Sequence, residues 1–154
     1  MKALLKIIGV AALAGAFVHI MMNWSVMPEQ VPQHYNSLGE VDAWAAKPFI
    51  FFPPAIGVVL WLLTELAQRF PMMIHMMDDK SARNKRQIES AKWMMVCLQF
   101  ELALLFTYLS VKDVYVAKGQ SFGLQTMEMP IILFIIFGTA IGFTIYSFTQ
   151  KSIS

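Results

Sequence analysis

Four long apolar stretches constrain the fold of this chain more than any other feature. Only two acidic residues, Glu65 and Glu101, and no basic ones interrupt them. A helix needs about 20 apolar residues to cross a bilayer, and helix satisfies the backbone hydrogen bonds that lipid cannot. The sequence therefore predicts an all-α fold, a four-helix transmembrane bundle that forms one integral membrane domain over residues 1–154. The expected spans are 7–27, 49–68, 93–111 and 129–150.

The composition agrees with a membrane protein. Hydrophobic residues make up 57% of the chain and charged residues 14%, against about 25% charged in a soluble domain. The single cysteine, Cys97, excludes an intrachain disulfide and a cysteine-rich zinc site. No phosphate-binding loop or hydrolase motif occurs, so no cofactor is expected. The predicted partner is the lipid bilayer, and nucleic acid is not expected, because the basic cluster is small and lies beside a membrane.

Basic residues predict the orientation of the spans. Nine Lys and Arg residues flank one set of helix ends and three flank the other. Basic residues concentrate in cytoplasmic segments. Both termini and the 69–92 segment are therefore expected in the cytoplasm of a multi-pass cell-membrane protein, with the loops 28–48 and 112–128 outside.

Two segments have alternative interpretations. The first apolar stretch resembles a signal peptide with small residues at Ala14, Gly15 and Ala16, but its continuation to Met27 favours a retained membrane helix. The third helix is expected to extend into the cytoplasm over about 80–92. The basic 69–92 segment is then expected to contact lipid headgroups, with docking of a cytoplasmic protein as the second interpretation.

Small residues mark faces suited to close helix packing. Gly138 and Gly142 form a G-x-x-x-G motif in the fourth span, and Gly15 belongs to a small-residue pair in the first. Such residues allow transmembrane backbones to approach closely. We expect packing within the chain, with homo-oligomer formation as the alternative.

Polar residues inside the spans are candidate functional groups, because ionisable residues in a membrane are costly. Glu65 is expected near the cytoplasmic end, Glu101 at mid-membrane, facing the bundle interior, and His19 in the outer half. Asn23 shares a helix face with His19, and Tyr108 shares one with Glu101. One interpretation is a proton or ion path. The other is a set of separate polar contacts, such as a pair between Glu65 and Arg69.

The loop between the first two spans carries the richest chemistry. We expect residues 31–35 to be extended, Gly39 to allow a turn with positive φ and Asn36 to cap that turn. Asp42 is expected to contact Lys47, His34 or a turn amide. Tyr35 and Trp44 are expected to pack against the helix ends, so that the loop forms an ordered lid or a ligand-binding surface. Zinc requires three or four ligands, and His34 and Asp42 supply two unless Glu29 or Glu40 joins them.

The loop also carries a family resemblance. The matching residues are Pro28, Glu29, Val31, Pro32, His34, Tyr35, Asn36, Gly39, Asp42, Trp44 and Lys47. This pattern resembles the bacterial domain-of-unknown-function family 1648 (DUF1648), in which such residues recur in this order between two membrane helices. The family includes the amino-terminal part of the Sdp immunity proteins, which protect Bacillus cells from a toxin secreted by their siblings and help to relay its presence.

These features predict a non-enzymatic membrane protein of sensing or immunity type that engages an extracytoplasmic peptide or lipid through residues 28–47. The first alternative is a small proton- or ion-coupled transporter that uses Glu101, Glu65 and His19. The second is a membrane-embedded hydrolase or transferase centred on His34 and Asp42.

Overall fold

The computed structural model describes residues 1–69, 82–123 and 125–149. Its long helices are α1 (Lys2–Asn23), α2 (Phe52–Arg69), α3 (Ala82–Ala117) and α4 (Glu128–Thr149). All four are long and apolar enough to cross a membrane, which confirms the predicted all-α, four-span fold. Short 3₁₀ helices cover Trp24–Val26 (η1), Lys47–Phe51 (η2) and Gln125–Met127 (η4).

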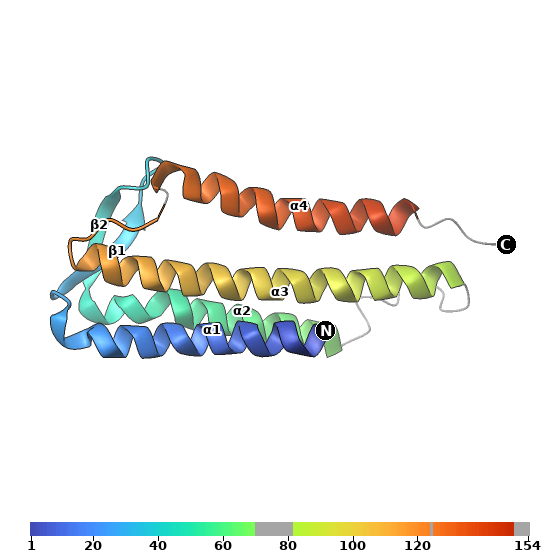
Figure 1. The fold of residues 1–154 in the computed structure, drawn as a ribbon, viewed down its shortest axis with the longest axis horizontal. Coiled ribbons are helices and arrows are strands. Elements are labelled where there is room, and N and C mark those ends of the chain that lie inside the picture. Colours follow the sequence, from blue (N-terminus) through green and yellow to red (C-terminus); the bar gives the residue numbers. More distant parts are fainter. Residues whose placement is uncertain (70–81, 124, 150–154) are drawn as a thin grey trace.

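The helices are not arranged as four equal members of a bundle. In Figure 1, α1, α2 and α3 lie side by side, whereas α4 lies on the far side of α3 from α1 and α2. The helix α3 is the central element, since it packs against the other three. The start of α1 and the end of α4 lie at the end of the molecule opposite to the loop between α1 and α2 (Figure 1).

Local sequence explains the start of α2, and the length of α3 shows how it relates to the membrane. Pro53 and Pro54 lie in the first turn of α2, where proline costs no hydrogen bond and its fixed φ suits the helix. The 36 residues of α3 give a length of about 54 Å, which exceeds a hydrocarbon core of about 30 Å. The helix therefore projects beyond the membrane. The extension expected over about 80–92 is helical from Ala82 onward, and residues 70–81 of the 69–92 segment lie outside the described residues.

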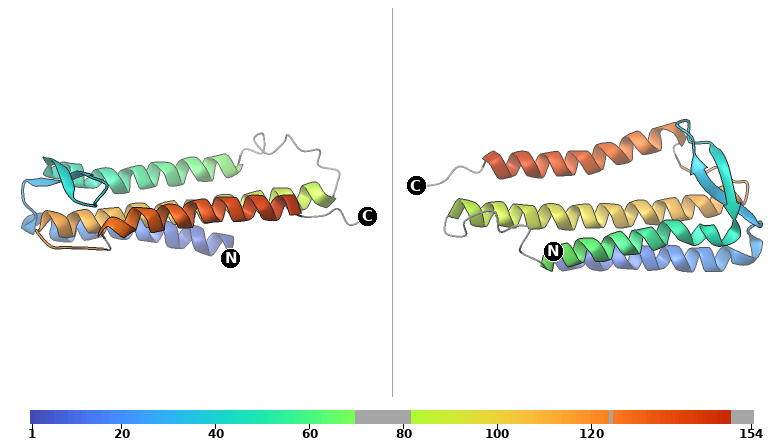
Figure 2. Two further views of the ribbon diagram at one scale, coloured as in Figure 1. Left: turned by 90° about the horizontal axis from the view of Figure 1, so that it is seen from above. Right: turned by 180° about the vertical axis from the view of Figure 1, so that it is seen from behind.

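The loop between α1 and α2 contains a small β-hairpin that the sequence predicted only in part. Strands β1 (Gln30–Tyr35) and β2 (Val41–Ala46) pair antiparallel, with Val31 opposite Ala45 and Tyr35 opposite Val41. The extended conformation was predicted for the first strand, whereas the second strand was missed. Figure 2 shows the hairpin across one end of the helices, called the hairpin end below.

The turn of the hairpin follows the predicted chemistry. Gly39 has a φ of 79°, which a residue with a side chain rarely adopts. The Asn36 side-chain oxygen accepts hydrogen bonds from the backbone N–H groups of Leu38 and Glu40, at 2.9 and 3.0 Å. The predicted capping role of Asn36 is therefore confirmed, and this turn sets which residues of the two strands face each other.

Candidate functional site

One side of the hairpin is anchored to the helices. Val31 is fully buried in a cluster that joins α1, η2 and α3. Lys47 is buried as well, and its Nζ donates to the Met27 carbonyl oxygen at 2.9 Å and lies 4.9 Å from the centre of the Trp24 ring. The Tyr35 hydroxyl donates to the Asp113 Oδ1 of α3 at 2.7 Å. The predicted ordered loop, with Tyr35 directed at the helix ends, is confirmed.

The other side of the hairpin is displayed to the surroundings. His34 Nδ1 and Asp42 Oδ1 are 2.6 Å apart, and the two side chains are 69% and 43% exposed. Leu38 at the turn is 58% exposed and Trp44 on β2 is 48% exposed. An imidazole–carboxylate pair therefore stands beside two exposed apolar side chains on a fixed backbone.

The structure selects one of the contacts expected for Asp42 and corrects the packing expected for Trp44. Asp42 contacts His34, as one of the three expected contacts, but it does not pair with Lys47, whose Nζ is held by Met27 and lies 3.9 Å from Glu29 Oε1. The strand pairing explains this, because it turns Asp42 towards the neighbouring strand and buries Lys47 beneath the hairpin. Trp44 remains half exposed instead of packing fully against the helix ends.

A buried ionic cluster behind the hairpin was missed by the sequence analysis. Lys112 of α3 and Glu128 of α4 form an ion pair at 2.5 Å, with side chains only 5% and 2% exposed. The Lys112 Nζ also lies 4.4 Å from the centre of the Tyr35 ring. The cluster, defined as Tyr35, Lys112, Asp113 and Glu128, thus joins β1, α3 and α4. The adjacent Lys112 and Asp113 after a long apolar stretch were the available sequence signal.

The environment of Tyr35 suits its role as a donor. Burial, followed by the nearby Asp113 carboxylate, raises the pKa of Tyr35 above its ordinary value. The phenol is therefore protonated at neutral pH and donates a hydrogen bond to Asp113. This contact connects the hairpin to α3 across 78 residues of sequence.

The polar residues of the spans fall into three separate environments. Glu65 contacts Lys6 at 2.6 Å and Arg69 at 3.2 Å, so its predicted pair with Arg69 is confirmed and extended to α1. At the hairpin end, Asn23 accepts from Lys118 at 2.8 Å and His19 stacks on Tyr115.

Glu101 faces α4. It accepts a hydrogen bond from Thr139 Oγ1 at 2.6 Å and borders the same cavity as Tyr108. Tyr108 contacts Glu128 rather than Glu101, and His19 and Asn23 contact the other end of α3, so the expected polar neighbours of Glu101 are replaced by Thr139. Thr139 was not predicted as a partner, because it lies 38 residues away in sequence.

The glycines predicted to pack within the chain do not do so. A Cβ atom added at Gly15, Gly138 or Gly142 would meet no described atom within 4 Å. At Gly57 it would instead lie 2.7 Å from side-chain atoms of both Leu13 and Phe106. Close packing thus occurs at Gly57, where α2 meets α1 and α3, and at Gly9, where an added Cβ would lie 3.3 Å from Ala103 Cβ, and not at the motif in α4.

The residues that the structure describes contain no group of three His, Cys, Asp or Glu side chains that could hold a metal ion. His34 and Asp42 therefore form a pair without a third such ligand among residues 1–69, 82–123 and 125–149. A hydrogen-bonded imidazole and carboxylate can present an acceptor and a donor to a ligand.

Comparison with known proteins found one similarity, and it includes the hairpin. No curated protein and no solved structure matches the chain. The family model of a domain of unknown function, DUF1648, matches residues 11–58. The match covers the second half of α1, the complete hairpin and the first turns of α2. The matched part of the chain is therefore similar to DUF1648, and the anchored hairpin lies within it.

Proposed function

We propose that this protein is a non-enzymatic bacterial cell-membrane protein of sensing or immunity type that engages an extracytoplasmic ligand through its hairpin. The observation that carries the proposal is that some residues of the hairpin are fixed to the helices while others are exposed. Val31, Tyr35 and Lys47 anchor it, while His34 and Asp42 remain exposed. A surface held rigidly before binding loses little conformational entropy when a ligand docks.

The exposed side chains suit a peptide or a lipid headgroup. Trp44 and Leu38 offer apolar contact, and the His34–Asp42 pair offers hydrogen bonds and charge. The resemblance of the DUF1648 domain to the amino-terminal part of Sdp-type immunity proteins supports a secreted peptide as the ligand. The buried ionic cluster supplies a route for relay, because a ligand that moves β1 would act on Asp113 of α3 and, through Lys112, on Glu128 of α4.

The proposal requires the hairpin to face the outside. In a Cys97→Ser background, a cysteine placed by Ser37→Cys is expected to react with a membrane-impermeant maleimide in intact cells. The same reagent is expected to label a Ser81→Cys variant only after the cells are opened, because basic residues hold the 69–92 segment in the cytoplasm. Labelling in the opposite pattern would contradict the proposed orientation.

The His34–Asp42 pair is expected to be needed for recognition but not for folding. The assay compares growth of cells that lack the gene with growth of complemented cells in spent medium from the same strain. Wild-type protein is expected to restore growth, whereas Asp42→Asn and His34→Ala should lose most of the protection while reaching normal levels of folded protein. Both side chains are exposed, so their loss removes little buried contact.

The matched control for this experiment is Glu29→Gln. The Glu29 side chain is 92% exposed, carries the same charge as Asp42 and lies at the other end of the hairpin, 3.9 Å from Lys47 and without an imidazole contact. It is expected to protect like the wild type. Full protection by Asp42→Asn would refute recognition through this pair, and protection that falls in proportion to folded yield would make the pair structural.

A further inference from the structure

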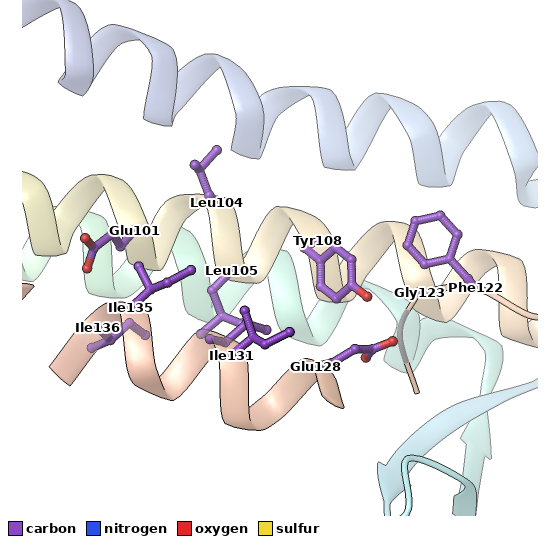
Figure 3. A pocket seen from close by; sticks show the side chains of 11 residues that line it. Glu101, Leu104, Leu105, Tyr108, Phe122, Gly123, Glu128, Ile131, Ile135 and Ile136 are labelled. Carbon is purple, nitrogen blue, oxygen red and sulfur yellow. The ribbon is translucent and has the colours of Figure 1, made fainter. Parts of the chain in front are cut away.

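A second candidate site lies away from the exposed hairpin surface, between α3 and α4. The structure contains a cavity of about 510 Å³ there, partly open at its side, within the usual range of about 300–1,000 Å³ for small-molecule sites. Figure 3 shows Glu101 towards one end of the cavity and Glu128 near the other, with Leu105 and isoleucines of α4 between them. An elongated apolar space thus connects two carboxyl groups.

The two carboxyl groups differ in their ion pairs and hydrogen bonds. Glu128 is ion-paired with Lys112 at 2.5 Å. Glu101 accepts one hydrogen bond at Oε1 from Thr139, while its buried Oε2 has no hydrogen-bond partner in the described part of the chain. A buried acceptor without a donor is costly, and a carboxylate inside a membrane is costly unless it is paired. Oε2 therefore lacks a donor, and since it is shielded from the cavity that Glu101 lines, a donor in the cavity would reach it after rotation of the carboxyl group.

The charges around the cavity select the kind of occupant. Among the described residues that line it, Glu101, Tyr108 and Glu128 are titratable and none is Lys, Arg or His. The nearest basic group to Glu128, Lys112, is already engaged. An anionic lipid head would meet two carboxyl groups without a cation to balance it. A cationic head would instead supply both the charge and the N–H donors that Glu101 lacks.

We propose that this cavity binds one single-chain lipophilic amine, with its ammonium group at Glu101 and its alkyl chain along Leu105 and the isoleucines of α4. The open side of the cavity allows entry from the lipid phase, because α4 packs against α3 and stands apart from α1 and α2. This site differs from the exposed hairpin surface in ligand chemistry and in its residues, and its lining includes Glu128 of the buried ionic cluster.

The test uses the full chain, purified in a neutral maltoside detergent and titrated with three probes of equal chain length. The probes are dodecylammonium, dodecanol and dodecanoate, and native mass spectrometry counts the molecules bound. One dodecylammonium per chain is expected to bind about tenfold more tightly than either other probe, as a charge-assisted hydrogen bond allows. Glu101→Gln should remove this preference, because it keeps the shape of the side chain but not its charge.

Variants that fill the cavity test whether the amine occupies the space between α3 and α4. Ile132→Trp should block binding by filling that space, and the milder Leu105→Phe serves the same purpose if the first variant does not fold. His34→Ala is the control for the hairpin and should bind dodecylammonium like the wild type. If it loses binding, the amine binds at the hairpin and the cavity proposal is wrong.

Equal binding of all three probes would also overturn the proposal, since it would mean that any alkyl chain from the bilayer occupies the cavity. So would unchanged preference for dodecylammonium in Glu101→Gln. Neither outcome affects the proposed recognition by the hairpin, whose test measures protection by His34 and Asp42 variants.

Discussion

Replacement of Lys112 by methionine is expected to remove most of the folded protein. The change keeps a long unbranched side chain, one atom shorter than lysine, but removes the cation of the ion pair with Glu128, whose side chain is 2% exposed. Loss of one partner of a buried ion pair costs about 3–5 kcal/mol, a large part of a typical stability of about 5–15 kcal/mol. The measurement is the yield of monodisperse protein in detergent, together with its melting temperature.

The chain offers a matched control for this prediction. Lys2 and Glu89 form an ion pair with the same N–O distance of 2.5 Å, but their side chains are 28% and 57% exposed. Exposed pairs contribute little, so Lys2→Met should leave yield and melting temperature nearly unchanged. The double variant Lys112→Met/Glu128→Gln should recover part of the loss, because it also removes the buried negative charge that Lys112 neutralises. Equal behaviour of Lys112→Met and Lys2→Met would show that burial of the ionic cluster does not matter for stability.

Gly57→Leu is expected to cause the second large loss of folded protein. Even the first carbon of a side chain at this position would lie 2.7 Å from Leu13 Cδ2 and from Phe106 Cβ, so α2 would have to move away from α1 and α3. Overpacking of this kind costs about 1–3 kcal/mol, and occasionally more. A melting curve of the purified variant measures the effect.

Gly15→Leu and Gly142→Leu are the controls, because an added Cβ at either position meets no described atom within 4 Å. Both variants should melt close to the wild type. A loss confined to Gly142→Leu, with Gly57→Leu unaffected, would contradict the packing described above and would mean that α4 uses its glycine face against another molecule.

Features set by interactions between residues close together in the chain can be predicted from the sequence. The spans follow from the apolar character of consecutive residues, since the bilayer acts on each stretch alone. The turn at Asn36 and Gly39 follows from hydrogen bonds and a φ angle within four residues. The contact of Asp42 could be predicted only in part from the sequence. Its partner had to be chosen among neighbours in one loop, and strand register selected His34 rather than Lys47.

The candidate site was only partly predictable for the same reason. The exposed surface of the hairpin was identified because its residues lie close together in the chain. The anchoring contacts were not, because Tyr35 and Asp113 are separated by 78 residues. Similarly, Glu101 stood out as a carboxyl group in an apolar stretch, but its contact with Thr139 depends on the way in which α4 packs on α3.

The sequence by itself determined that this chain forms four membrane-spanning helices and carries an ordered, turn-containing loop between the first two. Hydrophobicity and turn chemistry act over short distances along the chain, so they can be read without a structure. Only the tertiary structure decided that Gly57 forms the tight contact, that Lys112 pairs with Glu128 and that a cavity borders Glu101. These features depend on which helix faces meet, and many apolar faces of similar composition could have met instead.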